Sequence, residues 1–263
     1  MLKCLCCICV ILLFIDGCTM LPVSRERKDF NEAEALYNKG DCDKAVPKFA
    51  EALQKEPGLQ DAYVYMAECS LKKYDFKETL KLAKQVTSVG AQNNEINERL
   101  KTVLTDGGQR ALERHDDDSA VLFFNEAVAL SQSDCRLHLL LGKALLARGD
   151  KGDMKAALTE FKTALNKSNQ PAQDTEVIRD ILFQRAKEYS ASGDMYAASR
   201  CYLAYTQNFN PDDVEACIAL GNIFLKMRNP VGALYYAQKA HDIDPQNKAA
   251  MELLNELNSP IHP

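Results

Sequence analysis

The sequence predicts an all-α fold, an α-solenoid of about six stacked helix pairs with a capping helix at the C-terminal end. Three observations lead to this expectation. The 263 residues include only 12 Gly and 9 Pro and no Trp. Long stretches are rich in Ala, Leu, Lys and Glu, which favour helices over strands. One short phrase also recurs six times, with small residues at matching places in each copy.

The recurring phrase is clearest near the two ends of the chain, as KGDCDKAVPKFAEALQKEP at 39–57 and RNPVGALYYAQKAHDIDP at 228–245. In every copy a turn precedes a small residue. The six small residues lie 34 to 41 positions apart and are Ala45, Thr79, Ala120, Ala157, Ala198 and Ala233. Four residues later stand Phe49, Ala83, Phe124, Phe161, Tyr202 and Ala237. Small side chains allow two helices to approach closely, and the larger ones fill the space between pairs.

A partner helix is predicted before each phrase. It is marked by a small residue, twelve positions upstream in five copies and slightly further in the fourth: Ala33, Ala67, Gly108, Gly142, Ala186 and Gly221. Gly in a helix interior costs about 1 kcal/mol relative to Ala. The neighbours Gly107 and Gly108 therefore make the third unit the weakest match to a helix pair among the six.

This pattern resembles the tetratricopeptide repeat, a helix–turn–helix unit of about 34 residues. The resemblance implies an array over 26–258, with units at about 26–59, 60–93, 101–134, 135–170, 179–212 and 214–247. One unit cannot bury its apolar face alone, so the units stack. Lys248–Asn258 is predicted to be the capping helix over the last unit, and 259–263 a loose tail. The second unit departs from the family pattern, because Tyr74 stands where its turn usually has Gly.

Two segments exceed the repeat length. The stretch 91–101 (AQNNEINERLK) is expected to extend a helix, whereas 166–174 (NKSNQPAQD) is expected to be a loop because of Pro171.

The N-terminal segment predicts export. Met1–Lys3 carries one positive charge, and Cys4–Ile15 is an unbroken apolar run of twelve residues. As a helix this run rises about 18 Å, which is short of a bilayer core of about 30 Å. The short basic start, the apolar middle and the small Gly17 before Cys18 are typical of a cleaved secretory signal over 1–17.

Ile15, Asp16, Gly17 and Cys18 resemble the lipobox of bacterial lipoproteins, with Asp16 as a departure. The resemblance implies that Cys18 carries a diacylglyceryl group and an N-acyl chain such as palmitate, followed by a short tether over 18–25. Thr19 implies sorting to the outer membrane, facing the periplasm. Two alternatives stay open: an uncleaved hydrophobic start, and a palmitoylated cysteine cluster in a eukaryotic cell.

The family resemblance also implies a binding groove along the first helix of each unit. At the fifth positions stand Phe30, Val64, Thr105, Leu139, Phe183 and Ile218, and at the ninth Glu34, Glu68, Gln109, Lys143, Lys187 and Asn222. The stripe is mostly apolar, acidic toward the N-terminal end and basic further on. It suits an extended or amphipathic-helical protein segment. The Lys and Asn pattern of the carboxylate-clamp repeats is missing. Packing of these side chains between units is the alternative.

Other chemistry is not indicated. The net charge of −5 does not favour nonspecific nucleic-acid binding. His115–Asp118 (HDDD) falls at a predicted turn, where Asp caps the next helix. No catalytic, metal, phosphate-loop or cofactor motif is present. Five cysteines outside the leader, Cys42, Cys69, Cys135, Cys201 and Cys217, are expected to be small buried hydrophobes, with a disulfide between neighbouring helices as the alternative.

These features together predict a non-enzymatic, lipid-anchored scaffold that binds a partner protein and supports a cell-envelope assembly. The architecture is similar to that of pilotin lipoproteins of type IV pili. Two alternatives are an adaptor that regulates peptidoglycan synthases and hydrolases, and a cytosolic co-chaperone with an uncleaved hydrophobic N-terminus.

Overall fold

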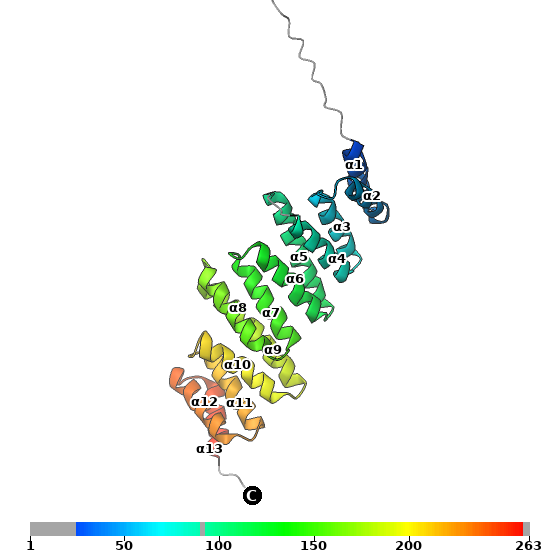
Figure 1. Cartoon of the computed structure of the whole chain (residues 1–263). Helices are drawn as coiled ribbons and strands as arrows, with labels where there is room; N and C mark the ends of the chain where they lie inside the picture. Colours follow the sequence, from blue (N-terminus) through cyan, green and yellow to red (C-terminus); the bar gives the residue numbers. More distant parts are fainter. Residues whose placement is uncertain (1–24, 90–92, 260–263) are drawn as a thin grey trace, which may run out of the picture.

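A computed structural model describes residues 25–89 and 93–259, and within them it contains thirteen α-helices and no strand (Figure 1). Twelve helices form six consecutive pairs: α1 (Arg25–Asn38) with α2 (Cys42–Lys55), α3 (Gln60–Lys72) with α4 (Phe76–Ser88), α5 (Asn94–Glu113) with α6 (Asp117–Leu130), α7 (Cys135–Arg148) with α8 (Asp153–Lys167), α9 (Pro171–Ala191) with α10 (Met195–Asn208), and α11 (Val214–Lys226) with α12 (Pro230–Ile243). The last helix is α13 (Lys248–Asn258). The predicted fold class is confirmed.

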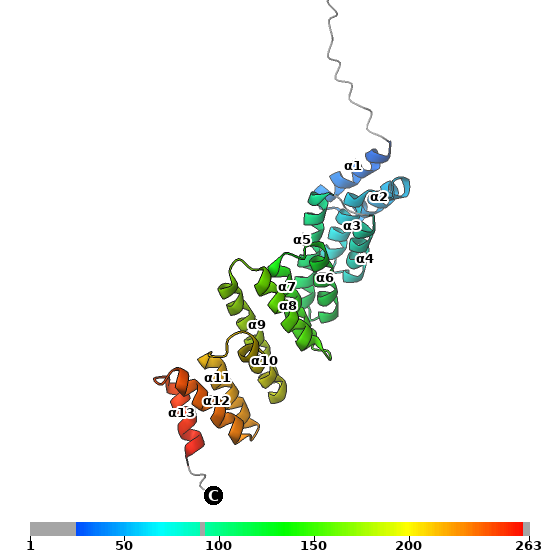
Figure 2. The same ribbon diagram turned by 60° about the vertical axis from the view of Figure 1, so that its left-hand side comes forward.

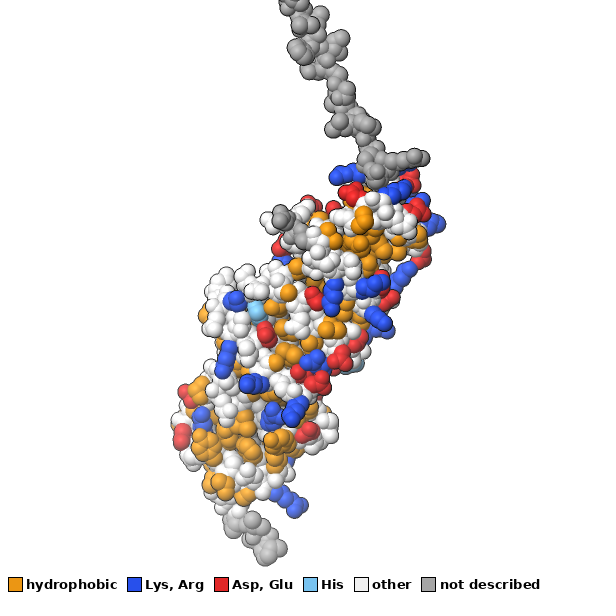
Figure 3. Space-filling view, viewed as in Figure 1, with side chains coloured by type: hydrophobic (Ala, Val, Ile, Leu, Met, Phe, Trp, Pro, Cys, Tyr) orange, Lys and Arg blue, Asp and Glu red, His pale blue; other side chains and the backbone are white. Residues whose placement is uncertain are grey.

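The pairs follow one another in a rod, with α1 at one end and α13 at the other (Figures 1 and 2). Figure 3 shows one face of this rod, with Lys, Arg, Asp and Glu interspersed along its length and apolar side chains exposed in patches toward both ends. Within the described ranges, no helix combines the length and the apolar character that crossing a bilayer requires.

The second helix of most pairs begins with the same cap. Asp41, Asp75, Asp116 and Asp194 each accept a hydrogen bond from the backbone N–H three residues on, and Asn229 does the same before α12. These bonds satisfy an N–H group that the first turn of a helix leaves free. The capping role expected of an Asp within the HDDD segment is thus confirmed.

In several pairs, one residue of the turn between the two helices has a left-handed backbone conformation with positive φ. Gly40 and Gly193 adopt it without strain, whereas Tyr74 adopts it at φ 59°. The Arg114 guanidinium lies 4.6 Å from the centre of the Tyr74 ring. This contact from the next pair offsets part of the backbone strain at a turn that lacks Gly.

The glycines of the first helices have a packing role. A Cβ added at Gly107 would lie 2.6 Å from the Phe123 ring, and one at Gly108 would lie 2.6 Å from the Phe124 ring. Neither residue has room for a side chain, because the buried rings of α6 rest on the α5 backbone. The third pair therefore forms with α5 continuous through both glycines, and their packing against the two rings offsets the cost that helix propensity assigns to them.

The two longer segments lengthen helices. α5 runs for 20 residues from Asn94, as expected for 91–101 in its described part. α9 runs for 21 residues and begins at Pro171, so the expectation that 166–174 is wholly loop is wrong. Pro is well suited to the first helical position, because the N–H it lacks would have no partner there. In this chain the residue starts a helix and does not extend a loop.

The core is a continuous apolar cluster from Val64 to Ile223, with smaller clusters at the two ends. At the C-terminal end Leu253 of α13 packs on Gly221, where an added Cβ would lie 2.6 Å from it. At the N-terminal end Phe49 stacks on Tyr65, with ring centres 5.1 Å apart. The capping helix α13 thus covers an apolar face that the last pair would otherwise expose.

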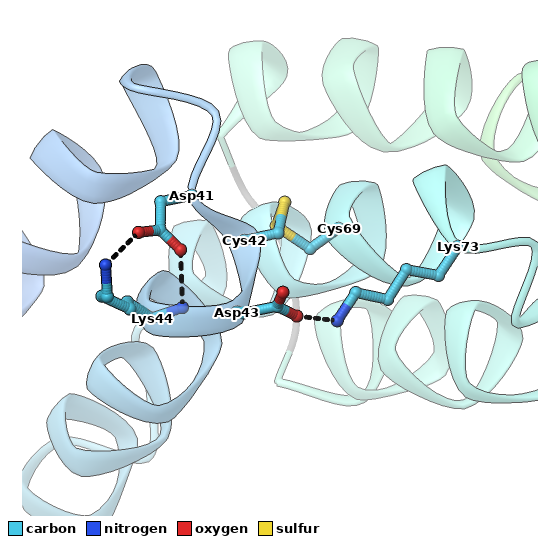
Figure 4. The surroundings of a disulfide bond; sticks show 6 residues. All are labelled: Asp41, Cys42, Asp43, Lys44, Cys69 and Lys73. Carbon is cyan, nitrogen blue, oxygen red and sulfur yellow. Dashed lines mark hydrogen bonds and ion pairs between the residues drawn. A yellow bond between two sulfur atoms is a disulfide. The ribbon is translucent and has the colours of Figure 1, made fainter.

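A disulfide joins Cys42 at the start of α2 to Cys69 of α3, and an ion pair between Asp43 and Lys73 lies beside it (Figure 4). For these two cysteines the expectation of unpaired buried hydrophobes is wrong, because the packing of the first two pairs brings their Cα atoms to 5.6 Å. Cys201 and Cys217 are free and buried, as expected, and Cys135 is free and half-buried. Burial raises the pKa of the Cys201 thiol to about 12, so it stays protonated.

Candidate functional site: a groove between α5, α7 and α9

The N-terminal part of the predicted groove is closed by the chain itself. Arg99 of α5 reaches back to α3, where Nη2 lies 3.0 Å from Glu68 Oε1 and Nη1 lies 3.8 Å from Asp61. The guanidinium also lies 4.2 Å from the centre of the Tyr65 ring. An arginine that is paired with carboxylates and stacked on an aromatic ring occupies the surface a ligand would need. We call these residues the Arg99 clamp.

The two predicted acidic groove residues belong to this clamp. Tyr65 donates a hydrogen bond of 2.7 Å to Glu34, while Glu68 is held by Arg99. Burial, followed by the hydrogen bond to Glu34, raises the pKa of Tyr65. The prediction that Glu34 and Glu68 present an acidic line to a partner is wrong, because their carboxylates are engaged within the chain.

Two apolar predictions are also corrected. Val64 is 0 % exposed and Phe183 is 4 % exposed, so neither side chain is accessible to a partner. Phe183 packs edge-on against Tyr202 and Tyr205, with ring centres 4.8 and 5.5 Å away. Both residues point into the core between units, which is the packing role that the sequence left as the alternative. Phe30 is half-buried and lies 5.5 Å from the Phe49 ring.

The junction between α9 and α11 is closed in the same way. Arg179 of α9 binds Asp213 at 3.0 Å and also pairs with Glu215. Its guanidinium lies 4.4 Å from the centre of the Phe183 ring. Among the remaining predicted residues here, Ile218 packs against the C-terminal cluster, and Asn222 donates to the Ile218 carbonyl at 3.1 Å. Lys187 is exposed and Thr105 donates to the Lys101 carbonyl.

Between these two closed junctions the surface is hollow. Two adjoining cavities of about 610 and 600 Å³ share Gln109 of α5 with Leu140 and Lys143 of α7. We call the combined hollow the central groove; the side chains that define it are Gln109, Arg136, Leu139, Leu140, Lys143, Val177, Ile181 and Arg185. Cavities of this size are in the range of ligand and peptide pockets.

The structure therefore brings together part of the predicted site. Leu139 and Lys143 line the central groove, together with Gln109 from the preceding unit. For the wall that α9 contributes, the repeat pattern predicted Phe183 and Lys187 as groove residues. It missed Val177 and Ile181, and Val177 falls outside the unit predicted to begin at 179. The amphipathic run after Pro171 was the available signal for this wall.

The walls of the groove combine apolar side chains with cations. Val177 is 38 % exposed, and Ile181 and Leu140 are half-buried. Arg136 and Lys143 are exposed, and neither forms an ion pair with any other described residue. Arg185 is engaged, since it pairs with Glu188 at 3.0 Å and donates to the Ala147 carbonyl at 2.9 Å. The groove thus offers two uncommitted cations beside apolar contacts.

No group of three or more potential metal ligands occurs in the part of the chain that the structure describes. His138, a buried histidine on α7, is held by Glu160 at 2.7 Å and by the Gln132 carbonyl at 3.0 Å, which accounts for both ring nitrogens. These contacts give His138 a structural role at the α7–α8 packing face. Cys18, the predicted lipidation site, lies outside the described residues.

Comparison with known proteins agrees with the helix-pair pattern. Residues 183–248 match the tetratricopeptide repeat family. Tetratricopeptide repeat protein 16 of Mus musculus is 28 % identical over 167 residues, which cover 62 % of this chain; the chain spans about a fifth of the length of that curated relative (21 %).

Many solved structures are similar to the chain, among them the following three. YrrB, described as a tetratricopeptide protein with an unusual peptide-binding site, is 17 % identical, with 85 % of this chain and 89 % of that chain covered and a TM-score of 0.36. PilW, described as a type IV pilus biogenesis factor, is 16 % identical, with 87 % and 98 % covered and a TM-score of 0.36. Pseudomonas aeruginosa PilF is 16 % identical, with 88 % and 97 % covered and a TM-score of 0.35.

Proposed function

We propose that this tetratricopeptide-repeat protein-interaction scaffold is anchored to lipid through Cys18 and holds a segment of a partner protein in the central groove. The observation that carries the proposal is the contrast along the rod. The junctions on either side are filled by Arg99 and Arg179, whereas the α5–α7–α9 junction is open and lined by exposed apolar and cationic side chains. A surface of this composition suits an extended or helical segment with apolar anchors.

The lipid anchor is a proposal from the leader. One acyl chain binds a bilayer only marginally, while several chains hold a protein stably. Thr19–Ser24, the six residues between Cys18 and the start of α1, would span at most about 20 Å at about 3.3 Å per residue, so the array would work close to the membrane. The Cys42–Cys69 disulfide supports an oxidising compartment over the cytosol, because structural disulfides are rare in the cytosol. It thereby disfavours the cytosolic co-chaperone alternative.

We also propose that the protein is located at the outer membrane, facing the periplasm, and supports the assembly of a cell-envelope complex. A pilus or secretin assembly is the first candidate and a peptidoglycan adaptor the second. Both rest on the leader and on the repeat architecture.

Site-specific crosslinking tests the groove. A photoreactive amino acid is placed at Lys143, in the groove, and separately at Lys162, an exposed lysine of α8, as the control. We expect partner adducts from the groove position only, and we expect them to be lost when Ile181→Asp is added. Equal adducts from both positions, or adducts that survive Ile181→Asp, would contradict the proposal.

Intact mass tests the anchor. A mature chain beginning at Cys18 with acyl mass that resists hydroxylamine supports thioether-linked lipid. Acyl mass released by hydroxylamine indicates palmitoyl thioesters on the cysteine cluster, and an unmodified chain starting at Met1 refutes lipid anchoring.

A further inference from the structure

We infer that the partner segment is an amphipathic helix with two acidic side chains seven residues apart and apolar anchors between them. The inference rests on the proposed function of the central groove and specifies what the groove recognises. It follows from the two cations, their spacing, and the apolar side chains that separate them.

The arginines that close the neighbouring junctions are paired with carboxylates, whereas the two groove cations, like exposed lysines such as Lys162 and Lys187, are not paired within the described ranges. Arg99, Arg148 and Arg179 each lie within 3.0 Å of a carboxylate oxygen, whereas Arg136 and Lys143 have no ion pair among the described residues. Arg136 stands in the first turn of α7, where the helix dipole disfavours positive charge. An external carboxylate would relieve this unfavourable placement, and Lys143 offers a second attachment point in the same groove.

The distance between the two cations favours a helical partner segment over an extended one. Arg136 and Lys143 are seven residues apart on α7, which is about 10.5 Å along the helix axis. Residues seven apart in a partner helix lie on one face at the same distance. An extended strand covers this distance in about three residues, and side chains three apart in a strand point to opposite sides. One face of a strand therefore cannot serve both cations.

Apolar contacts lie between the two charges. Leu140, half-buried, stands midway between Arg136 and Lys143 on α7 beside Leu139, which is only 7 % exposed, and Val177 and Ile181 stand one turn apart on the facing α9. A helix lying between α7 and α9 would bury one or two apolar side chains against these residues, and each fully buried side chain contributes about 1.5–3 kcal/mol before ordering costs.

The acidic side chains near the groove belong to helices other than α7. Asp174, Asp180 and Glu188 belong to α9, whereas Glu113 at the end of α5 and Asp117 at the start of α6 line the same cavity as Lys143. Asp180 lies 3.7 Å from Arg179. This distribution orients the partner, because its acidic edge is attracted to α7 and repelled from α9.

The test uses the full chain and a fluorescent helical peptide of about 18 residues, with two Glu seven positions apart and Leu between them. Two control peptides have Gln in place of both Glu, or the Glu pair nine positions apart and hence on opposite faces. Fluorescence anisotropy gives the affinities. We expect the first peptide to bind about tenfold more tightly than either control.

Variants of the protein test whether Lys143 is the residue that recognises the acidic side chains of the peptide. Lys143→Glu should weaken binding of the Glu peptide by about three- to tenfold, and a Lys peptide should then bind that variant better than the Glu peptide does. Lys162→Glu, a matched reversal on α8, should change nothing. Circular dichroism and thermal melting confirm that each variant is folded.

The outcomes separate this inference from the proposed function. If all three peptides bind equally and Ile181→Asp abolishes binding, the groove binds partners but the acidic-helix inference is wrong. The inference is equally overturned if no peptide binds while partner adducts still form at Lys143. The absence of such groove-specific adducts refutes the proposed function itself.

Discussion

The α3–α5 junction and the α7–α9 junction use equivalent faces of the same repeat, yet one is closed and the other is open. At the first, Arg99 crosses to Glu68 and Tyr65 of the preceding unit. At the second, no described carboxylate of α9 forms an ion pair with Arg136 or Lys143, and a hollow of about 610 Å³ remains. A groove position in a repeat array is therefore available to a partner only if the next unit does not fill it.

The Cys42–Cys69 disulfide is expected to make the largest single contribution to the stability of the two N-terminal helix pairs. Removing the crosslink by Cys42→Ala with Cys69→Ala, or by reductant, should lower the free energy of unfolding by about 3.5 kcal/mol, because the unfolded chain loses a constraint across 27 residues. Urea denaturation with and without dithiothreitol measures this. Cys135→Ser, at a free thiol, is the control and should respond to reductant as the unaltered chain does. Equal stability under both conditions contradicts the prediction.

Removing the clamp arginine compares the two junctions directly. Arg99→Met should destabilise the chain by about 2 kcal/mol, because it leaves the partly buried Glu68 without a cation. Arg136→Met at the open junction should change stability by less than about 0.5 kcal/mol. Urea midpoints of the two variants give the comparison, and equal effects would mean that the clamp does not hold the closed junction.

The ion pair between Arg148 and Asp153 at the turn from α7 to α8 predicts a pH effect on stability. Hydrogen bonds from Arg148, at 2.9 Å to each oxygen, hold the pKa of the buried Asp153 below its ordinary 3.8. The stability it contributes is present above pH 3.8 and is lost as the pH falls through the lower folded-state value. Asp153→Asn should cost about 1.5 kcal/mol at pH 7 and progressively less below pH 3.8. Chemical denaturation across pH 2–7 measures this, and a constant difference would refute it.

The smallest expected change concerns the clamp hydroxyl. Tyr65→Phe removes the hydrogen bond to Glu34 but keeps the ring under Arg99, so stability should fall by about 1 kcal/mol. Tyr235→Phe, at an exposed ring of α12, is the matched control and should be neutral within about 0.5 kcal/mol. Thermal melting distinguishes the two, and a neutral Tyr65→Phe would show that the ring alone supports the clamp.

The helix pairs were predictable because their signals are local. Small residues such as Ala45 and Gly142, and caps such as Asp41, lie within one unit and act over a few residues. The paired Phe rings explain why Gly107 and Gly108 strengthen the packing of the third pair, a reason that helix propensity does not contain. Pro171 was wrongly expected to lie in a loop, because Pro is common in loops, but it begins α9.

From its residues alone this chain specifies an all-α array, its six pairs and its capping helix, because periodic burial and end caps depend on neighbours close in sequence. The closed and open junctions, the Cys42–Cys69 bond and the inaccessibility of Val64 depend on side chains from different units. Arg99 meets Glu68 across 31 residues, and Arg179 meets Asp213 across 34. Such contacts are set by the angle at which consecutive pairs stack, and that angle emerges only when all the units are packed together.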